Sequence, residues 1–256
     1  MNEVARKLFE VIFLNLWTYS TPKSFFPLLT WVVPPIMLLS SLFCIAGIYV
    51  GFFVAPTDFQ QGEVYRIIFI HVPSAWMSMF LYLVIVFWCL IGLIFNTRLS
   101  FMMAKSLAPT GAIMTIIALW TGALWGKPTW GTWWVWDARL TSELLLFFLY
   151  LGYILLGSAI DDQKKSDRIT AILAMIGGVN IPVIYFSVEW WNTLHQGASI
   201  SLTAAPKMAN SMLLGIGLMS ISFWMYAVGA SFCRLRTSIL VREKDAGWLR
   251  HADGSH

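Results

Sequence analysis

Residues 72–95 read VPSAWMSMFLYLVIVFWCLIGLIF, a run of 24 residues without a charged side chain. At a rise of about 1.5 Å per residue, a helix of this length crosses the roughly 30 Å hydrocarbon core of a bilayer. The run lacks the alternation of barrel strands, so a helix is the structure that satisfies its backbone hydrogen bonds inside lipid. Five further charge-free runs lie at about 28–53, 106–124, 144–160, 169–188 and 208–232. We therefore predict an all-α polytopic membrane protein with six transmembrane helices.

The composition agrees with this fold class and excludes several others. Hydrophobic residues make up 58% of the 256 residues and charged residues only 12%, about half the charged fraction of a soluble domain. The aromatic content of 16% excludes disorder. The net charge of +4 is small and scattered, which argues against nucleic-acid binding. The three cysteines form no CxxC or CxxCH pattern, so neither a disulfide framework nor covalent c-type haem attachment is encoded.

The chain divides into three parts around the predicted helices. Residues 27–232 form the membrane domain, and residues 233–256 form a polar tail. Residues 1–26 lack the features of a cleaved signal peptide, and their apolar positions 4, 8, 11 and 12 predict one face of an interfacial helix.

Basic residues are distributed unevenly between the two ends of the predicted bundle. Thirteen of the 17 Lys and Arg residues fall in the N-terminal part, the turns at 96–105 and 161–168, and the tail. Because basic residues are retained on the cytoplasmic side, both termini are predicted to be cytoplasmic. The outer loops, at about 54–71, 125–143 and 189–207, are longer than the turns between helices on the cytoplasmic side. We therefore expect function on the outer face.

Two of these outer loops are rich in tryptophan. Residues 125–141 read WGKPTWGTWWVWDARLT, and the third loop opens with Glu189-Trp190-Trp191. Half of the 14 tryptophans lie here, namely Trp125, Trp130, Trp133, Trp134, Trp136, Trp190 and Trp191. An aromatic belt that anchors helix ends at the headgroups is the simpler alternative. Five indoles within twelve residues, interrupted by glycines that permit close backbone approach, instead favour a platform for a flat ligand.

Two of the four histidines fall on the same outer side. His71 precedes a proline that favours the first turn of a helix, so it is predicted at the outer mouth of the second helix. His195 follows the fifth helix, close behind a Trp-Trp pair, whereas His251 and His256 lie in the polar tail. A single histidine at a helix end is more often structural. Two that flank an indole platform suit the two axial positions of a haem iron.

Haem also carries two propionates, which need cationic or hydrogen-bonding partners away from water. Arg139 and Lys127 border the tryptophan-rich stretch, and Arg66 lies five residues before His71. Each could equally be a snorkelling residue at the interface, and Arg139 could be a local partner of Asp137.

Three motifs carry a family resemblance. The stretch WGxxWxWDxRLT from Trp130 to Thr141 resembles the WWD signature of the haem-handling proteins of cytochrome c biogenesis. YRIIFIHVPSAWMS around His71 and SVEWWNTLHQG around His195 are similar to the CcmC family of haem exporter proteins. The resemblance covers roughly residues 45–230.

The resemblance implies a haem-delivery protein rather than an enzyme, located in the bacterial inner membrane. Haem b would be presented at the periplasmic face, with His71 and His195 as iron ligands, and passed to the haem chaperone CcmE. The resemblance further implies as partners the small subunit CcmD and an ABC transporter formed by CcmA and CcmB. The chain has no Walker A sequence, so any ATP hydrolysis would come from those partners.

Other classes of membrane protein fit the sequence less well. A bis-His b-type cytochrome that relays electrons is the main alternative, but its ligands would lie inside helices and both histidines here are predicted at the boundary. A secondary transporter would place ionisable residues near the midplane, and the six predicted cores contain none, although Pro109 and Pro182 are expected to kink the third and fifth helices. An intramembrane metalloprotease is disfavoured because HExxH is absent.

Overall fold

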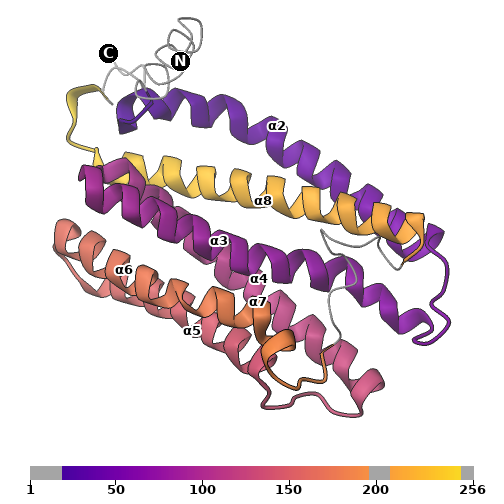
Figure 1. The fold of residues 1–256 in the computed structure, drawn as a ribbon. Coiled ribbons are helices and arrows are strands. Elements are labelled where there is room, and N and C mark those ends of the chain that lie inside the picture. The colour runs from indigo at the N-terminus through magenta and orange to yellow at the C-terminus, as the bar shows by residue number, and fades with distance from the viewer. Residues whose placement is uncertain (1–18, 196–207, 249–256) are drawn as a thin grey trace, which may run out of the picture.

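The computed structural model describes residues 19–195 and 208–248, which form a bundle of long helices (Figure 1). In chain order the elements are α2 (Pro22–Tyr49), the π-helical turn η1 (Val50–Val54), the 3₁₀ turn η2 (Glu63–Ile67), α3 (Ile68–Phe95), α4 (Arg98–Trp130), α5 (Ala138–Ala159), α6 (Gln163–Gly178), α7 (Asn180–Trp190) and α8 (Asn210–Arg242). Within the described residues, six stretches are long and apolar enough to cross a membrane: Pro22–Val54, Glu63–Phe95, Arg98–Trp130, Ala138–Ala159, Gln163–Trp190 and Asn210–Arg242. The predicted all-α fold with six transmembrane helices is confirmed.

The helices extend beyond their charge-free centres. α4 begins at Arg98 rather than near residue 106, and α8 continues to Arg242 rather than ending near 232. Helical hydrogen bonding continues past the hydrocarbon core because long charged side chains at helix ends can reach water. The apolar positions 4, 8, 11 and 12 of the predicted interfacial helix lie outside the described residues.

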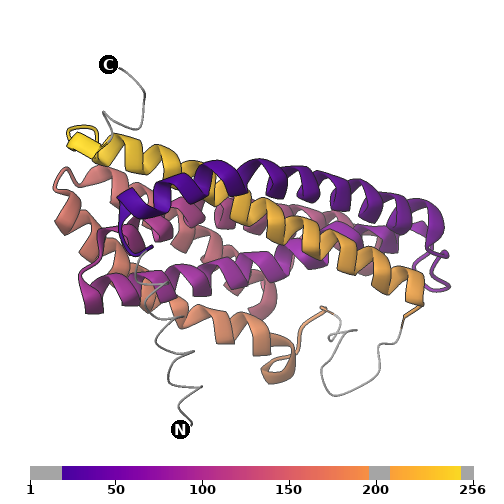
Figure 2. The same ribbon diagram turned by 90° about the horizontal axis from the view of Figure 1, so that it is seen from above.

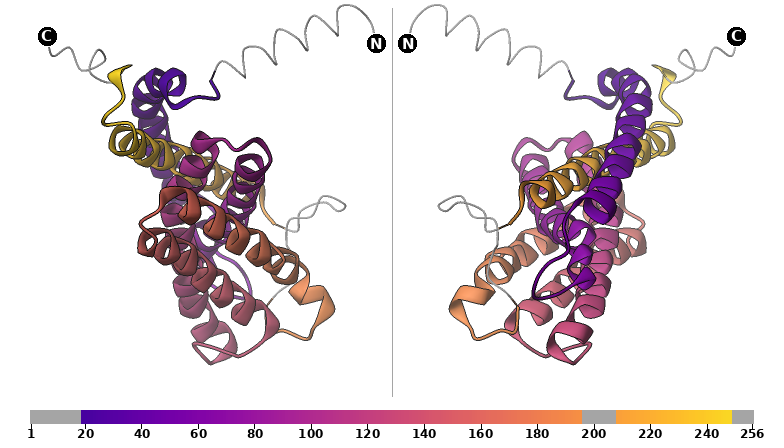
Figure 3. Two further views of the ribbon diagram at one scale, coloured as in Figure 1. Left: turned by 90° about the vertical axis from the view of Figure 1, so that its left-hand side faces the viewer. Right: turned by 90° about the vertical axis from the view of Figure 1, so that its right-hand side faces the viewer.

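The helices are arranged in three layers, which are clearest when the bundle is viewed along its length (Figure 3). α2 and α8 form one outer layer and run alongside each other over most of their length (Figure 2). α3 and α4 pair in the middle, and α5 packs with α6 and α7 on the other side. The turns at 55–62 and 131–137 and the segment after α7 therefore lie at the same end of the bundle (Figure 1).

Small residues hold the α2–α8 layer together. The hydroxyls of Ser40 and Ser222 each donate to the backbone carbonyl of the other residue, at 2.9 and 2.8 Å. A Cβ atom added at Gly47 would lie 2.8 Å from the Met219 side chain, and one at Gly229 would lie 2.5 Å from the Met37 side chain. Close backbone approach and interhelical hydrogen bonds are the usual means of helix association in lipid, where burial of apolar side chains contributes little.

The fifth membrane stretch is broken at Val179, between α6 and α7. Pro182 lies four residues after Gly178, so its ring removes a hydrogen bond to that carbonyl and crowds it. The amide Nδ2 of Asn180 donates to the backbone carbonyl of Ser142 at 2.9 Å and fastens the break to α5. At the kink expected from Pro182, the structure has a one-residue interruption between α6 and α7, where Val179 keeps helical backbone angles. At Pro109 the helix α4 continues through the proline.

A buried charge cluster closes the opposite end of the bundle. Asp167 on α6 is only 4% exposed. Its carboxylate accepts two hydrogen bonds from Arg242 on α8, at 3.1 and 2.9 Å, and pairs with Lys105 on α4 at 2.9 Å. This cluster connects three helices at the end farthest from the tryptophan-rich turn.

Candidate functional site

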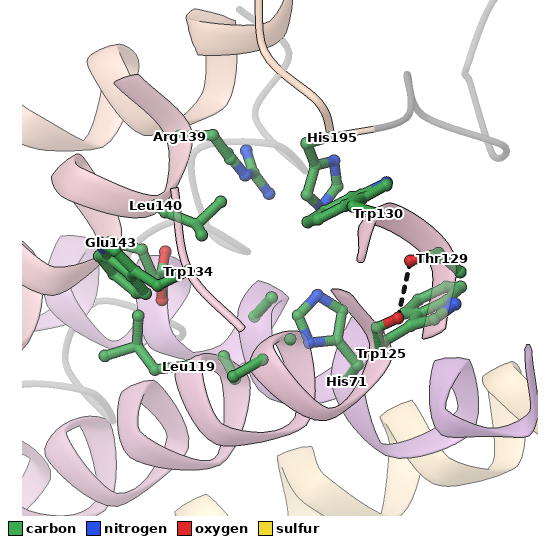
Figure 4. Close-up of a pocket in the computed structure, with 14 residues that line it drawn as sticks. His71, Leu119, Trp125, Thr129, Trp130, Trp134, Arg139, Leu140, Glu143 and His195 are labelled. Carbon is green, nitrogen blue, oxygen red and sulfur yellow. Dashed lines mark hydrogen bonds between the residues drawn. The ribbon is translucent and has the colours of Figure 1, made fainter. Parts of the chain in front are cut away.

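A pocket of about 720 Å³ lies at the end of the bundle that carries the tryptophan-rich turn (Figure 4). Residues of α3, α4, α5, the turn at 131–137 and the segment after α7 line it: His71, Ala75, Ala118, Leu119, Gly122, Ala123, Trp125, Thr129, Trp130, Trp134, Arg139, Leu140, Glu143 and His195. The small side chains on α3 and α4 leave the space, and the aromatic and polar side chains surround it.

His71 lies in the first turn of helix α3, so the outer loop predicted at about 54–71 ends a few residues earlier than expected. The 3₁₀ turn η2 runs directly into α3 at Ile68, so His71 belongs to the first turn of α3 and Pro73 to the second. The hydroxyl of Ser74 donates to the Ile70 carbonyl at 2.8 Å and supports the helix at this point. The imidazole of His71 is therefore held by regular secondary structure.

His195 approaches the pocket from the segment after α7. Its ring lies against Trp130, with centroids 6.3 Å apart and an interplanar angle of 58°. The His71 and His195 rings face each other across the pocket with centroids 6.3 Å apart and planes tilted by 35° (Figure 4). The structure thus brings together two histidines that are 124 positions apart in the sequence.

The separation of the two imidazoles would accommodate one metal ion between them. With metal–nitrogen bonds of about 2.0 Å and about 1.2 Å from each nitrogen to its ring centre, two imidazoles on opposite sides of a metal have centres roughly 6.4 Å apart. The observed 6.3 Å agrees with this value.

Two helix caps fix the turn that carries Trp134. α4 ends at Gly131, which adopts a left-handed conformation with φ of 79° and donates its N–H to the Lys127 carbonyl at 3.1 Å. Asp137 begins α5 as its N-cap, with Oδ1 accepting from the Leu140 N–H at 2.8 Å. The predicted loop 125–143 is therefore mostly helical, and only residues 131–137 form the turn.

The predicted tryptophan platform divides into two groups. Trp125, Trp130 and Trp134 line the pocket. Trp125 packs edge-on against His71, with centroids 5.7 Å apart, and its Nε1 donates to Gln61 at 2.7 Å. Four other tryptophans do not line the pocket and are about half exposed or more: Trp133, Trp136, Trp190 and Trp191. Their exposure in the turn at 131–137 and at the end of α7 suits the aromatic-belt role.

Arg139 and Glu143 form the polar part of the pocket wall on α5. Arg139 donates from Nη1 to the backbone carbonyl of Ile184 on α7 at 2.7 Å. Glu143 is 7% exposed and accepts a hydrogen bond from Ser78 on α3 at 2.7 Å. The two charged residues are four positions apart on one helix and so lie on the same face.

The other predicted polar residues serve the scaffold. Lys127 is exposed and donates to the Gly131 carbonyl at 3.1 Å. Arg66 forms an ion pair with Glu63 and donates to the carbonyls of Gly51 and Ala55, which connects η2 to the end of the first membrane stretch. Asp137 caps α5 through one carboxylate oxygen. None of these three side chains lines the pocket.

Glu143 and the small residues of α4 are pocket residues that sequence reasoning missed. Glu143 was assigned to the end of a loop, although its position four residues after Arg139 could have placed it on the same helix face. No local signal distinguishes Ala118, Gly122 or Ala123 from other small residues of a membrane helix. A Cβ added at Gly122 would lie 3.1 Å from Cε1 of His71, so this glycine makes room for the imidazole.

The fold and the site define a polytopic α-helical membrane protein with a paired-imidazole pocket at one end of its bundle. Residues 15–250 match the family CcmC, heme exporter protein C, and the chain belongs to this family. It is 42% identical over 236 residues to heme exporter protein C of Escherichia coli (strain K12), covering 92% of this chain and 95% of the relative. Proteins of the same name in Bradyrhizobium diazoefficiens and Haemophilus influenzae are 41% and 39% identical, over 90% and 92% of this chain and 87% and 96% of theirs.

Proposed function

We propose that this protein binds haem b in the pocket, with His71 and His195 as the two axial ligands of the iron. The observation that carries the proposal is the 6.3 Å separation of the two imidazole rings across an apolar cavity. Membership of the haem exporter family supports a role in haem handling for cytochrome c maturation, as a transport or delivery protein rather than a catalyst.

The residues around the imidazoles suit the rest of a haem molecule. Trp125, Trp130 and Trp134 offer indole surfaces to a flat macrocycle, and each aromatic contact contributes about 0.5–1.5 kcal/mol beyond area burial. The Arg139 guanidinium supplies donors in the pocket wall for a propionate.

An electron-relaying b-type cytochrome is the weaker proposal. Such a protein would hold its haem between helices, where electrons can pass toward the opposite face. Here one ligand lies in the first turn of α3 and the other in the segment after α7, so the iron site is at one end of the bundle. A site at that end is accessible to a partner that collects the haem.

We further propose that the haem is presented at the periplasmic face of the bacterial inner membrane, with both chain termini in the cytoplasm. The proposal rests on the uneven distribution of Lys and Arg between the two ends of the bundle. The haem chaperone CcmE would take the haem from the pocket, CcmD would join this protein in the membrane, and the ABC transporter of CcmA and CcmB would release the loaded chaperone.

The proposal is tested by titrating the purified protein with haem and, in cells, by measuring haem covalently attached to CcmE. The wild type is expected to give a six-coordinate, low-spin spectrum at one haem per chain. The double variant His71→Ala/His195→Ala is expected to lose this spectrum and to leave CcmE unloaded. His251→Ala, which removes a tail histidine, is the matched control and should behave as wild type. A double variant that still binds low-spin haem would refute the assignment of the ligands.

A further inference from the structure

The side of His71 that faces away from the pocket is held by a threonine on the neighbouring helix. Nδ1 of His71 on α3 lies 3.0 Å from Oγ1 of Thr121 on α4. The two residues are 50 positions apart, and Thr121 does not itself line the pocket. The backbone carbonyl of Ala118, one turn before Thr121, is a further acceptor for the same imidazole.

The other hydrogen bond of the Thr121 hydroxyl determines whether Nδ1 of His71 donates or accepts in this contact. A threonine hydroxyl has one proton to donate. Oγ1 of Thr121 donates it to the backbone carbonyl of Ile117, one turn earlier, at 2.6 Å. The hydroxyl must therefore accept from His71, so Nδ1 carries the imidazole proton. In a neutral ring, Nε2 then has the free lone pair.

We propose that Thr121 is a positioning residue for haem binding, since it fixes the His71 tautomer and ring orientation that present Nε2 to the iron. The inference rests on the proposed function, because it gives His71 the role of an iron ligand. A hydrogen bond to the outer nitrogen of a metal-binding histidine orients the ring and makes the ligand more basic. Loss of such a partner typically lowers metal affinity about 10–100-fold.

The chain offers a closely matched control for this residue. Thr115 lies six residues earlier on α4, is buried, and donates its hydroxyl to the Gly111 carbonyl at 2.8 Å, as Thr121 does to Ile117. Thr115 does not line the pocket. Thr115→Val and Thr121→Val therefore each remove one hydroxyl-to-carbonyl hydrogen bond within α4 and make the same change of shape. Only Thr121→Val also removes the contact to His71.

The experiment compares purified wild type, Thr121→Val, Thr121→Ser and Thr115→Val by haem titration, absorbance spectrum and reduction potential of the bound haem. Thr121→Val is expected to lower haem affinity about tenfold. It should also raise the reduction potential, because a less basic axial ligand stabilises the ferric iron less. Thr121→Ser keeps the acceptor and should restore both properties, and Thr115→Val should leave both as in wild type.

The possible failures are distinguishable. Equal affinities and potentials in Thr121→Val and Thr115→Val, in a wild type that binds low-spin haem, would overturn the inference and leave the proposed function standing. A wild type that binds no haem would overturn the proposed function and the inference with it. A fall in affinity that Thr121→Ser does not reverse would assign Thr121 to packing alone and would also overturn the inference.

Discussion

The two histidines of the pocket are held in very different ways. His71 lies in a turn of α3, with Trp125 packed against its ring and Thr121 bonded to its outer nitrogen, both from α4. His195 lies beyond the end of α7, and the aromatic contact to its ring comes from Trp130. One imidazole is thus fixed by two packed helices, whereas the other is carried by the chain that follows a helix end.

This difference suits a protein that must both hold haem and give it up. A ligand on a helix is oriented before binding, so little conformational freedom is lost when the iron bond forms. A connecting segment lacks the regular hydrogen bonds of a helix, so a ligand on it can be displaced with less disruption of the fold. We therefore expect the bond to His71 to persist longest and the bond to His195 to break first when a partner removes the haem.

The largest expected effect separates the two histidines from each other. His71→Ala should lower haem affinity about 1000-fold and His195→Ala about 100-fold, losses of roughly 4.1 and 2.7 kcal/mol. The difference is expected because His71 is held within a helix and His195 is carried by a connecting segment. Haem titration of the two purified single variants measures it.

Both single variants should bind five-coordinate haem, since one imidazole remains in each. Addition of free imidazole should restore a six-coordinate spectrum in His195→Ala at a lower concentration than in His71→Ala. This order is expected because the position left by His71 is enclosed between α3 and α4, with Trp125 against it, whereas the position left by His195 lies beside a segment at the end of the bundle. Equal affinities in the two variants would show that the two histidines contribute alike, and would refute the expectation that His71 holds haem more strongly.

A smaller effect is expected from the tryptophans. Trp130 and Trp134 line the pocket, and Trp130 also contacts His195. Their replacement together by alanine should lower haem affinity about 30-fold, since two aromatic contacts contribute about 2 kcal/mol. Trp133 and Trp191 are 54% and 49% exposed and do not line the pocket, so their double replacement is the control.

The measurement is the haem dissociation rate for both double variants, alongside their yield in the membrane. The control pair should release haem at the wild-type rate. Similar rates for the two double variants would mean that the indoles act as a general membrane anchor and contribute no specific contact to haem.

Much of the fold could be predicted from the sequence because lipid imposes simple rules on it. A spanning segment needs a long uncharged run, and all six such runs become helices. The ends were less predictable, since Arg98 and Arg242 are helical yet lie beyond any charge-free run. The sequence predicts a kink from Pro182, but the position of the interruption at Val179 depends on contacts such as that of Asn180 with Ser142.

The site was predictable in kind but not in detail. The spacing of His71 and His195 relative to the predicted helices placed both on one side, and the structure brings their rings together. Composition could not show which indoles of the cluster face inward, because Gly131 and Asp137 determine the direction of the turn. The contact between Thr121 and His71 joins two helices at particular heights, and no local pattern in the sequence encodes it.

The smallest expected effect concerns Arg139, which supports the His195 side of the pocket. Its guanidinium donates to the Ile184 carbonyl on α7, the helix that leads to His195, and it also lines the pocket. Arg139→Met should speed haem dissociation about tenfold, or about 1.4 kcal/mol, a little below the usual value for a hydrogen bond to a charged group. Lys127→Met removes the same charge from an exposed site near the same turn and should change the rate by less than about twofold.

Combinations of this variant with others give the sharpest test of the comparison between the two sides. If Arg139 acts on the segment that carries His195, Arg139→Met together with His195→Ala should cost less than the sum of the separate effects, because residues in one network are coupled. Arg139→Met together with Thr121→Val should give the sum, since Thr121 acts on His71 from α4. The dissociation rates of the single and double variants supply both cycles. Additivity with His195→Ala and coupling with Thr121→Val would instead assign Arg139 to the His71 side of the pocket.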